Sequence, residues 1–216
     1  VRPDTGVHRY STLSRARSQL RRCVAHGDAV WRRMPRSDVL QGGPFAQMPK
    51  RLVVALYFYP RGGSAQVVRY LVTRLGRSWD ARLYTGSLGE AGALTHAGTF
   101  FRGMDPITMD YTAAEAAWRD GRDPMHADPP MHGSLEDQAG VPDTFLAKLS
   151  PPLQARQVSA WRRLFSRQEE APDIVHLNHL TPMHQAAFDV WKGAAVVTHL
   201  HGTELKMIQT IHDTPG

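Results

Sequence analysis

The residues LVVALYFY (52–59) form an uninterrupted apolar and aromatic run, and this run constrains the fold more than any other feature of the sequence. A strand with one face in water alternates apolar and polar residues, whereas a continuous apolar strand needs cover on both faces. The run is too short for a membrane span, which needs roughly 20 apolar residues. A glycine-containing turn over 60–64 follows, and apolar residues then recur at helical spacing over 65–76. This order predicts a buried strand with a crossover helix packed on the sheet.

The alternation of strand and helix patterns continues along the chain. Residues 121–144 interrupt it with a segment rich in proline, which predicts a long loop. Strands joined by helices with short connections form a parallel sheet. The sequence therefore predicts one α/β domain over residues 51–216, with a Rossmann-like parallel sheet and helices on both faces. The expected further strands are 81–87, 96–103, 173–179 and 194–200, the second of them weaker; the expected helices are 65–76, which ends at Gly76, 111–120, 149–171, 182–192 and one from about residue 203.

The positive charge of the chain belongs to its N-terminal segment. Residues 1–50 hold ten basic and three acidic side chains, a net charge of +7, whereas the other 166 residues hold 16 basic and 17 acidic ones, a net charge of −1. The segment lacks the apolar stretch of about 7–15 residues that a secretory signal contains. Its arginines and serines are compatible with a transit peptide or a nucleic-acid-binding arm. We predict instead a disordered extension, or residues upstream of a natural start at Met48, and no specific nucleic-acid partner.

Cysteine content and hydropathy indicate the compartment. Cys23 is the only cysteine, so the chain can form no intramolecular disulfide, and this fits a reducing environment. No apolar run approaches the length of a membrane span. The sequence predicts a cytoplasmic protein, with peripheral attachment to a membrane as the alternative.

Three segments that can carry chemistry follow predicted strands, at 60–64, 176–181 and 199–204. Because ligands bind at the carboxyl ends of parallel strands, we expect the three segments to meet at one edge of the sheet. Gly62 and Gly63 precede a helix, so their backbone can approach a phosphate at the positive end of the helix dipole. They match neither the dinucleotide fingerprint nor the P-loop, and a tight turn without a ligand is the alternative.

Histidines are concentrated in the last two strand–loop–helix units. No spacing among them matches a standard zinc site and no thiolate lies nearby, so we expect no metal. The loop histidines, His126 and His132, have no defining spacing and are expected to be structural. The histidines of the two units are His176, His179, His184, His199 and His201.

Taken together, PRGGSAQVVRYLVTRL, PDIVHLNHLTPMHQAA and AAVVTHLHGTELKM resemble, in this order and spacing, the N-terminal domain of glycosyltransferase family 4. The resemblance covers about residues 51–212. Members of that family are retaining enzymes of the GT-B fold, in which a cleft separates two Rossmann-like domains. Their N-terminal domain mostly binds the acceptor, and their C-terminal domain binds the nucleotide sugar. The partners implied are therefore a nucleotide sugar and an acceptor glycan, lipid or small molecule.

The resemblance also implies roles for single residues. Gly62 and Gly63 are expected at the donor diphosphate with Arg61 beside them, and His201 is expected near the donor sugar as the catalytic residue. His199 is expected to be a supporting strand residue. Enzymes of this kind generally need no metal, so no cofactor is expected. The residues expected to line the cleft and the acceptor are His176, Asn178, His179, Gly202 and Glu204, and Glu204 is expected to act as a helix-dipole partner rather than as a base.

One departure from the family is large. Its C-terminal domain carries a Glu-x7-Glu segment that holds the nucleotide sugar, and this sequence has no such pair. We therefore expect an N-terminal half, either as a fragment or as one subunit whose C-terminal half lies on another polypeptide. Two alternatives stay open: half of a GT-B sugar-nucleotide epimerase, and a non-catalytic Rossmann module that binds a phosphorylated ligand or a partner. Acceptor identity is expected to depend on residues 104–150.

Overall fold

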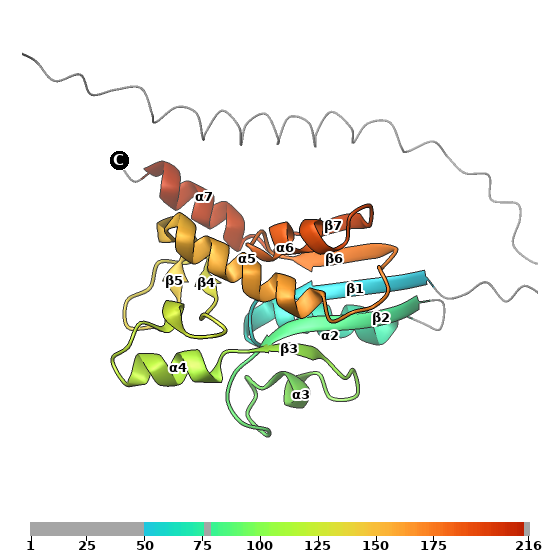
Figure 1. The fold of residues 1–216 in the computed structure, drawn as a ribbon, viewed down its shortest axis with the longest axis horizontal. Coiled ribbons are helices and arrows are strands. Elements are labelled where there is room, and N and C mark those ends of the chain that lie inside the picture. The colour runs from blue at the N-terminus through green and yellow to red at the C-terminus, as the bar shows by residue number, and fades with distance from the viewer. Residues whose placement is uncertain (1–49, 76–78, 214–216) are drawn as a thin grey trace, which may run out of the picture. The chain divides into compact units, whose positions relative to one another are not determined.

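A computed structural model describes residues 50–75 and 79–213. Its main feature is a five-stranded sheet in the order β3-β2-β1-β6-β7, in which every neighbouring pair is parallel (Figure 1). This sheet confirms the predicted α/β, Rossmann-like class. The strands are β1 (Lys50–Leu56), β2 (Trp79–Ser87), β3 (Ile107–Asp110), β6 (Ile174–Asn178) and β7 (Ala195–His199).

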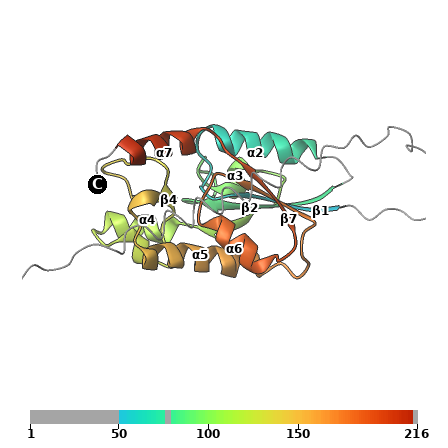
Figure 2. The same ribbon diagram turned by 90° about the horizontal axis from the view of Figure 1, so that it is seen from above.

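Helices cover both faces of this sheet, as predicted. Figure 2 shows α2 and α7 on one face, and α4, α5 and α6 on the other. A second, two-stranded sheet joins β4 and β5 inside and just after the proline-rich segment. The helices are α2 (Gly62–Arg74), α3 (Ala97–Phe100), α4 (Thr112–Arg119), α5 (Pro151–Phe165), α6 (Met183–Val190) and α7 (Thr203–Asp213); the short elements are η2 (Pro124–His126), β4 (Gly133–Ser134), β5 (Thr144–Phe145) and η3 (Leu146–Lys148).

Strand β1 is the centre of the core, as its apolar run predicts. Its residues from Leu52 to Leu56 are all buried, and the chain stays buried through Tyr57 and Phe58 beyond the strand. Residue Leu56 lies opposite Thr85 of β2 on one side and Asn178 of β6 on the other. Strands β1 and β6 therefore end level, β2 continues to Ser87, and the segments that follow the strands begin at one edge.

The predicted strand over 96–103 is wrong. These residues contain α3, and the third strand of the sheet is β3, farther along the chain. The physical reason is visible in the packing of Ala97 and Phe101, which are four residues apart and both fully buried. That spacing places two side chains on one face of a helical turn, whereas the adjacent aromatic residues Phe100 and Phe101 resemble a strand pattern.

The other predicted elements are present with shifted ends, and part of the domain prediction lies outside the described residues. The expected extension over 1–50 lies there except for Lys50, which begins β1. Gly76, the expected helix end, lies there too, but α2 already ends at Arg74, with Leu75 in an extended conformation as its cap.

A close approach between β2 and the chain after β1 gives a prediction of stability. A Cβ atom at Gly86 would lie 2.6 Å from both the backbone nitrogen of Tyr59 and the ring atom Cε2 of Tyr111. We expect Gly86→Ala to lower the free energy of unfolding by about 2–3 kcal/mol, because the strand must move away from the core. Urea unfolding followed by circular dichroism measures the change.

The matched control is Gly63→Ala, because a Cβ atom there meets nothing within 4 Å. This variant should change the free energy of unfolding by less than about 1 kcal/mol. Equal effects of the two substitutions would contradict the packing argument.

Candidate functional site

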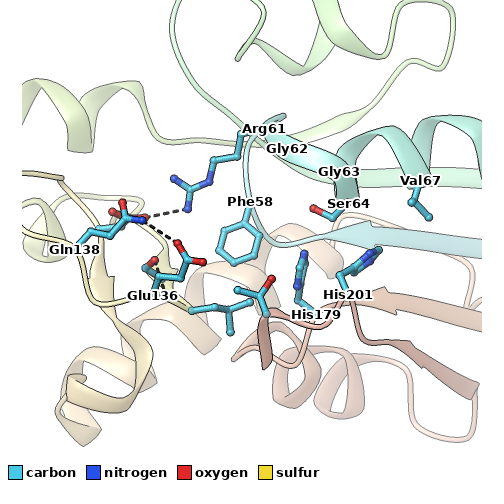
Figure 3. A pocket seen from close by; sticks show the side chains of 14 residues that line it. Phe58, Arg61, Gly62, Gly63, Ser64, Val67, Glu136, Gln138, His179 and His201 are labelled. Carbon is cyan, nitrogen blue, oxygen red and sulfur yellow. Dashed lines mark hydrogen bonds and ion pairs between the residues drawn. The ribbon is translucent and has the colours of Figure 1, made fainter. Parts of the chain in front are cut away.

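A cavity of about 590 Å³ opens at the carboxyl edge of the main sheet (Figure 3). Three of its sides come from the segments that the sequence analysis singled out after β1, β6 and β7. The fourth side comes from residues 134–143, the part of the proline-rich segment that precedes β5. The lining residues are Phe58, Arg61, Gly62, Gly63, Ser64, Val67, Ser134, Leu135, Glu136, Gln138, Asp143, His179, His201 and Thr203.

The N-terminus of α2 forms one rim of this cavity. Gly62 has a φ of +65°, which lets the chain turn sharply from the extended Arg61 into the helix. Among the described residues no side chain caps this helix end and its first turn holds no acidic residue. The first N–H groups of a helix have no partner within it, so this rim offers hydrogen-bond donors and the positive end of a dipole to an anion. A Cβ atom at Gly62 or Gly63 would meet nothing within 4 Å, so a ligand can come close to the backbone there.

The side chain of Arg61 crosses from this rim to the opposite wall. Its Nη2 lies 3.0 Å from Oδ2 of Asp143, whose carboxylate is buried. Its Nη1 lies 3.3 Å from the hydroxyl of Tyr59, and the guanidinium sits 5.2 Å from the ring centre of Phe58. Arg61 therefore already has an anionic partner and holds the two walls together at this end of the cavity.

His179 and Glu204 form a buried pair in the floor. The distance from His179 Nδ1 to Glu204 Oε1 is 2.7 Å, and the two side chains are 5% and 2% exposed. Since a carboxylate only accepts, Nδ1 carries the proton and Nε2 of the neutral ring carries a lone pair. Burial lowers the pKa of His179, although Glu204 opposes the shift. Burial acts to raise the pKa of Glu204, but its hydrogen bonds with backbone amides and His179 outweigh that and lower it.

His201 is held in a similar way by Asn178. The amide nitrogen of Asn178 donates to the carbonyl of Ala55 at 3.1 Å, so its Oδ1 is the atom that accepts from Nε2 of His201 at 2.9 Å. His201 therefore also has a fixed tautomer, with its lone pair on Nδ1. Burial, followed by the neighbouring histidines, lowers the pKa of His201 to about 4, so its ring is neutral near pH 7.

The remaining expected site residues are not among those that line the cavity. His199 stacks on His201 with ring centres 4.2 Å apart, and His176 lies 5.7 Å from His199 on the neighbouring strand. Gly202 has a φ of +89° and turns the chain into α7. Asn178 and Glu204 position the two histidines rather than line the space. Of the expected residues, Arg61, Gly62, Gly63, His179 and His201 line it.

Sequence reasoning assigned acceptor identity to residues 104–150, but it singled out no residue of the wall formed by the segment 134–143. Glu136 and Gln138 lie on this wall, joined by a hydrogen bond of 2.8 Å from Nε2 to Oε2 (Figure 3). The only available signal was the length of the loop, because long loops in compact domains are often functional. His132, expected to be structural, is fully buried against the rings of Tyr57 and Tyr111.

Metal-ligating groups and membrane-spanning helices can be judged for residues 50–75 and 79–213. In that part of the chain no group of three or more His, Cys, Asp or Glu residues is placed to hold a metal ion. The same residues contain no helix with the length and apolar character needed to cross a membrane. Comparison with protein-family models, with curated proteins and with solved structures returned no match for this chain.

Burial of His132 makes a prediction about pH. Burial, followed by the charge of Arg61, lowers its pKa from the ordinary 6.5 to about 4. Between these values the unfolded chain binds more protons than the folded one, so stability falls as the pH drops from about 6.5 to about 4. Between about pH 7 and about pH 4.5, the free energy of unfolding should fall by on the order of 2 kcal/mol more in the unchanged protein than in His132→Phe.

Urea unfolding at a series of pH values measures this slope in the two proteins. The comparison concerns the slope alone, because the substitution also removes the 3.0 Å contact between Nδ1 of His132 and the carbonyl of Gly133. Parallel curves for the variant and the unchanged protein would show that His132 has the same pKa in the folded and the unfolded chain, and would contradict the argument from burial.

Proposed function

We propose that residues 50–213 are the N-terminal, acceptor-side part of a retaining glycosyltransferase, which moves a sugar from a nucleotide sugar to an acceptor. One observation carries this proposal: the uncapped N-terminus of α2 at Gly62 and Gly63, and the neutral imidazole of His201, line the same cavity. The resemblance in sequence covers the segments that supply these residues. We place this protein in the cytoplasm or at the cytoplasmic surface of a membrane.

The chemistry of sugar transfer fits this arrangement. When the bond between the sugar and the diphosphate breaks, negative charge grows on the phosphate oxygens and positive charge grows on the sugar. Donors that are already oriented stabilise the leaving charge without a cost of reorganisation. The amides at Gly62 and Gly63 supply such donors for the diphosphate, and His201 contacts the sugar that is transferred. The segment 134–143 faces them and is the wall assigned to the acceptor.

One specific observation favours a second candidate, half of a sugar-nucleotide epimerase. An imidazole held by a buried carboxylate is the arrangement of a general base, and His179 with Glu204 has that arrangement at 2.7 Å. An epimerase needs a base that removes a proton from a sugar carbon, whereas a retaining transferase does not. Solvent deuterium appearing at a carbon of the sugar, during incubation with the complete enzyme, would support the epimerase.

Binding of inorganic pyrophosphate to the 216-residue chain tests the phosphate site. We expect amide shifts at Gly62, Gly63 and Ser64 in nitrogen-15 NMR spectra, because these residues form the uncapped helix end. The variant Gly63→Val should bind pyrophosphate about ten-fold more weakly, since its side chain would occupy the open space beside the backbone.

The matched control is Thr73→Val, which places the same side chain near the exposed far end of the same helix. Its affinity for pyrophosphate should be unchanged. If Gly63→Val binds as well as the unchanged chain, or if pyrophosphate leaves these amides unmoved, the proposal fails.

The affinity of the chain for a nucleotide sugar distinguishes half of a transferase from a module that binds the nucleotide on its own. Among the described residues that line the cavity, Phe58, Val67 and Leu135 are the only apolar side chains, aromatic or aliphatic, on which a nucleotide base could pack. We therefore expect UDP-glucose to bind no more than about ten-fold more tightly than pyrophosphate in calorimetric titration. Micromolar affinity would show that these residues hold a nucleotide on their own.

A further inference from the structure

The floor of the cavity presents hydrogen-bond acceptors rather than donors. The proton on Nδ1 of His179 is used by Glu204, and the proton on Nε2 of His201 is used by Asn178. Each ring therefore keeps one nitrogen with a lone pair. Because both partners are themselves buried and hydrogen-bonded, the rings cannot exchange tautomers without breaking these contacts.

Nε2 of His179 is a buried nitrogen that lacks a partner among the described residues. Its side chain is only 5% exposed and its ring lines the cavity. An unpaired buried polar atom has a free-energy cost on the order of 1–3 kcal/mol. A ligand that donates a hydrogen bond to this atom would recover that cost, whereas an anionic oxygen has no proton to donate.

The facing wall has the same polarity. Glu136 is exposed to the cavity and forms no ion pair within the described part of the chain. Gln138 uses its amide N–H to bind Glu136, which leaves its oxygen as an acceptor. Arg61, the one Lys or Arg among the described residues that line the cavity, is already paired with Asp143. This end of the cavity therefore repels anions and attracts groups that carry O–H or N–H⁺.

The rim of the cavity at α2 has the opposite preference to the floor and the facing wall. The N-terminus of α2 offers N–H donors and a positive dipole end, whereas His179 and Glu136 offer acceptors and negative charge. We propose that the cavity selects a phosphorylated ligand whose other end carries hydroxyl or ammonium groups and no acidic group, and that this end donates a hydrogen bond to Nε2 of His179. The inference rests on the proposed function and names the class of sugar that the site takes: neutral or amino sugars, not uronic acids.

Two commercially available sugar phosphates that differ in one group make the test. Glucose 1-phosphate carries a hydroxymethyl group where glucuronic acid 1-phosphate carries a carboxylate, and both have the same phosphate. We expect the 216-residue chain to bind glucose 1-phosphate at least about ten-fold more tightly in NMR titrations. Long-range proton–nitrogen spectra of the histidine rings should show Nδ1 of His179 protonated, and the Nε2 signal should shift with glucose 1-phosphate only. Equal affinity for the two compounds would overturn the inference.

A variant of His179 and a matched control link the preference to this ring. His179→Phe keeps a planar ring and removes the acceptor nitrogen, so the ratio of the two affinities should fall to less than about three-fold. His176→Phe makes the same change three residues earlier, on β6 and outside the cavity lining, and should keep the ratio. An unchanged ratio in His179→Phe would assign the selection to another residue and overturn the role of His179.

Folding and the phosphate site are checked separately in the same samples. The dispersion of the amide spectrum shows whether each variant folds, and if His179→Phe does not, the Nε2 signal of the unchanged chain still decides the question. Inorganic phosphate alone should shift Gly63 and Ser64 in every folded protein. If it does not, the proposed function fails together with the inference; if it does, and the two sugar phosphates bind equally, only the inference fails.

Discussion

The carboxylate of Glu204 accepts hydrogen bonds from three groups on two separate loops: Nδ1 of His179 at 2.7 Å, the amide of Leu180 at 3.3 Å and the amide of His201 at 3.2 Å. Burying a carboxylate is unfavourable unless donors replace the water that it loses. Here two amides and an imidazole do so, and the first turn of α7 adds the positive end of its dipole. One side chain thereby joins the carboxyl ends of β6 and β7 and fixes where α7 begins.

The geometry of the cavity floor depends on this carboxylate. His179 has a φ of +67°, a backbone conformation that residues other than glycine adopt infrequently, and its bond to Glu204 helps to hold it there. Asn178, one residue earlier, binds β1 and His201 together. The floor is therefore held in place by a connected hydrogen-bond network that leaves Nε2 of His179 as an unpaired acceptor, whereas the rim at α2 keeps free N–H groups. A rigid floor beside an unsatisfied rim is what a site needs if it is to bind an anion without rearranging.

Sequence patterns predicted those parts of the structure that depend on local periodicity and on parallel topology. The apolar run of β1 and the helical spacing after Gly63 each have one good solution, and parallel strands bring their carboxyl ends to one edge. The same reasoning failed at α3, where a single helical turn buries Ala97 and Phe101 and is too short to show a period. It also placed Glu204 at a helix dipole and in the cleft lining but did not foresee its bond to His179, because a bond to a side chain 25 residues earlier leaves no local trace.

The wall from the proline-rich segment shows why a loop can be part of a preorganised site. Its start is fixed to the core by Tyr57, whose hydroxyl accepts from the amide of Gly133 at 3.0 Å and donates to Oε1 of Gln157 at 2.8 Å. The side-chain amide nitrogen of Gln157 donates to the carbonyl of Met131. At its far end the segment is held by the pair between Asp143 and Arg61. Tyr57 and α5 hold the wall at its start and Arg61 holds it at its end, so Glu136 and Gln138 face the histidines from an anchored loop. The opposite polarity of the α2 rim and of the floor and wall therefore follows from the fold before any ligand binds.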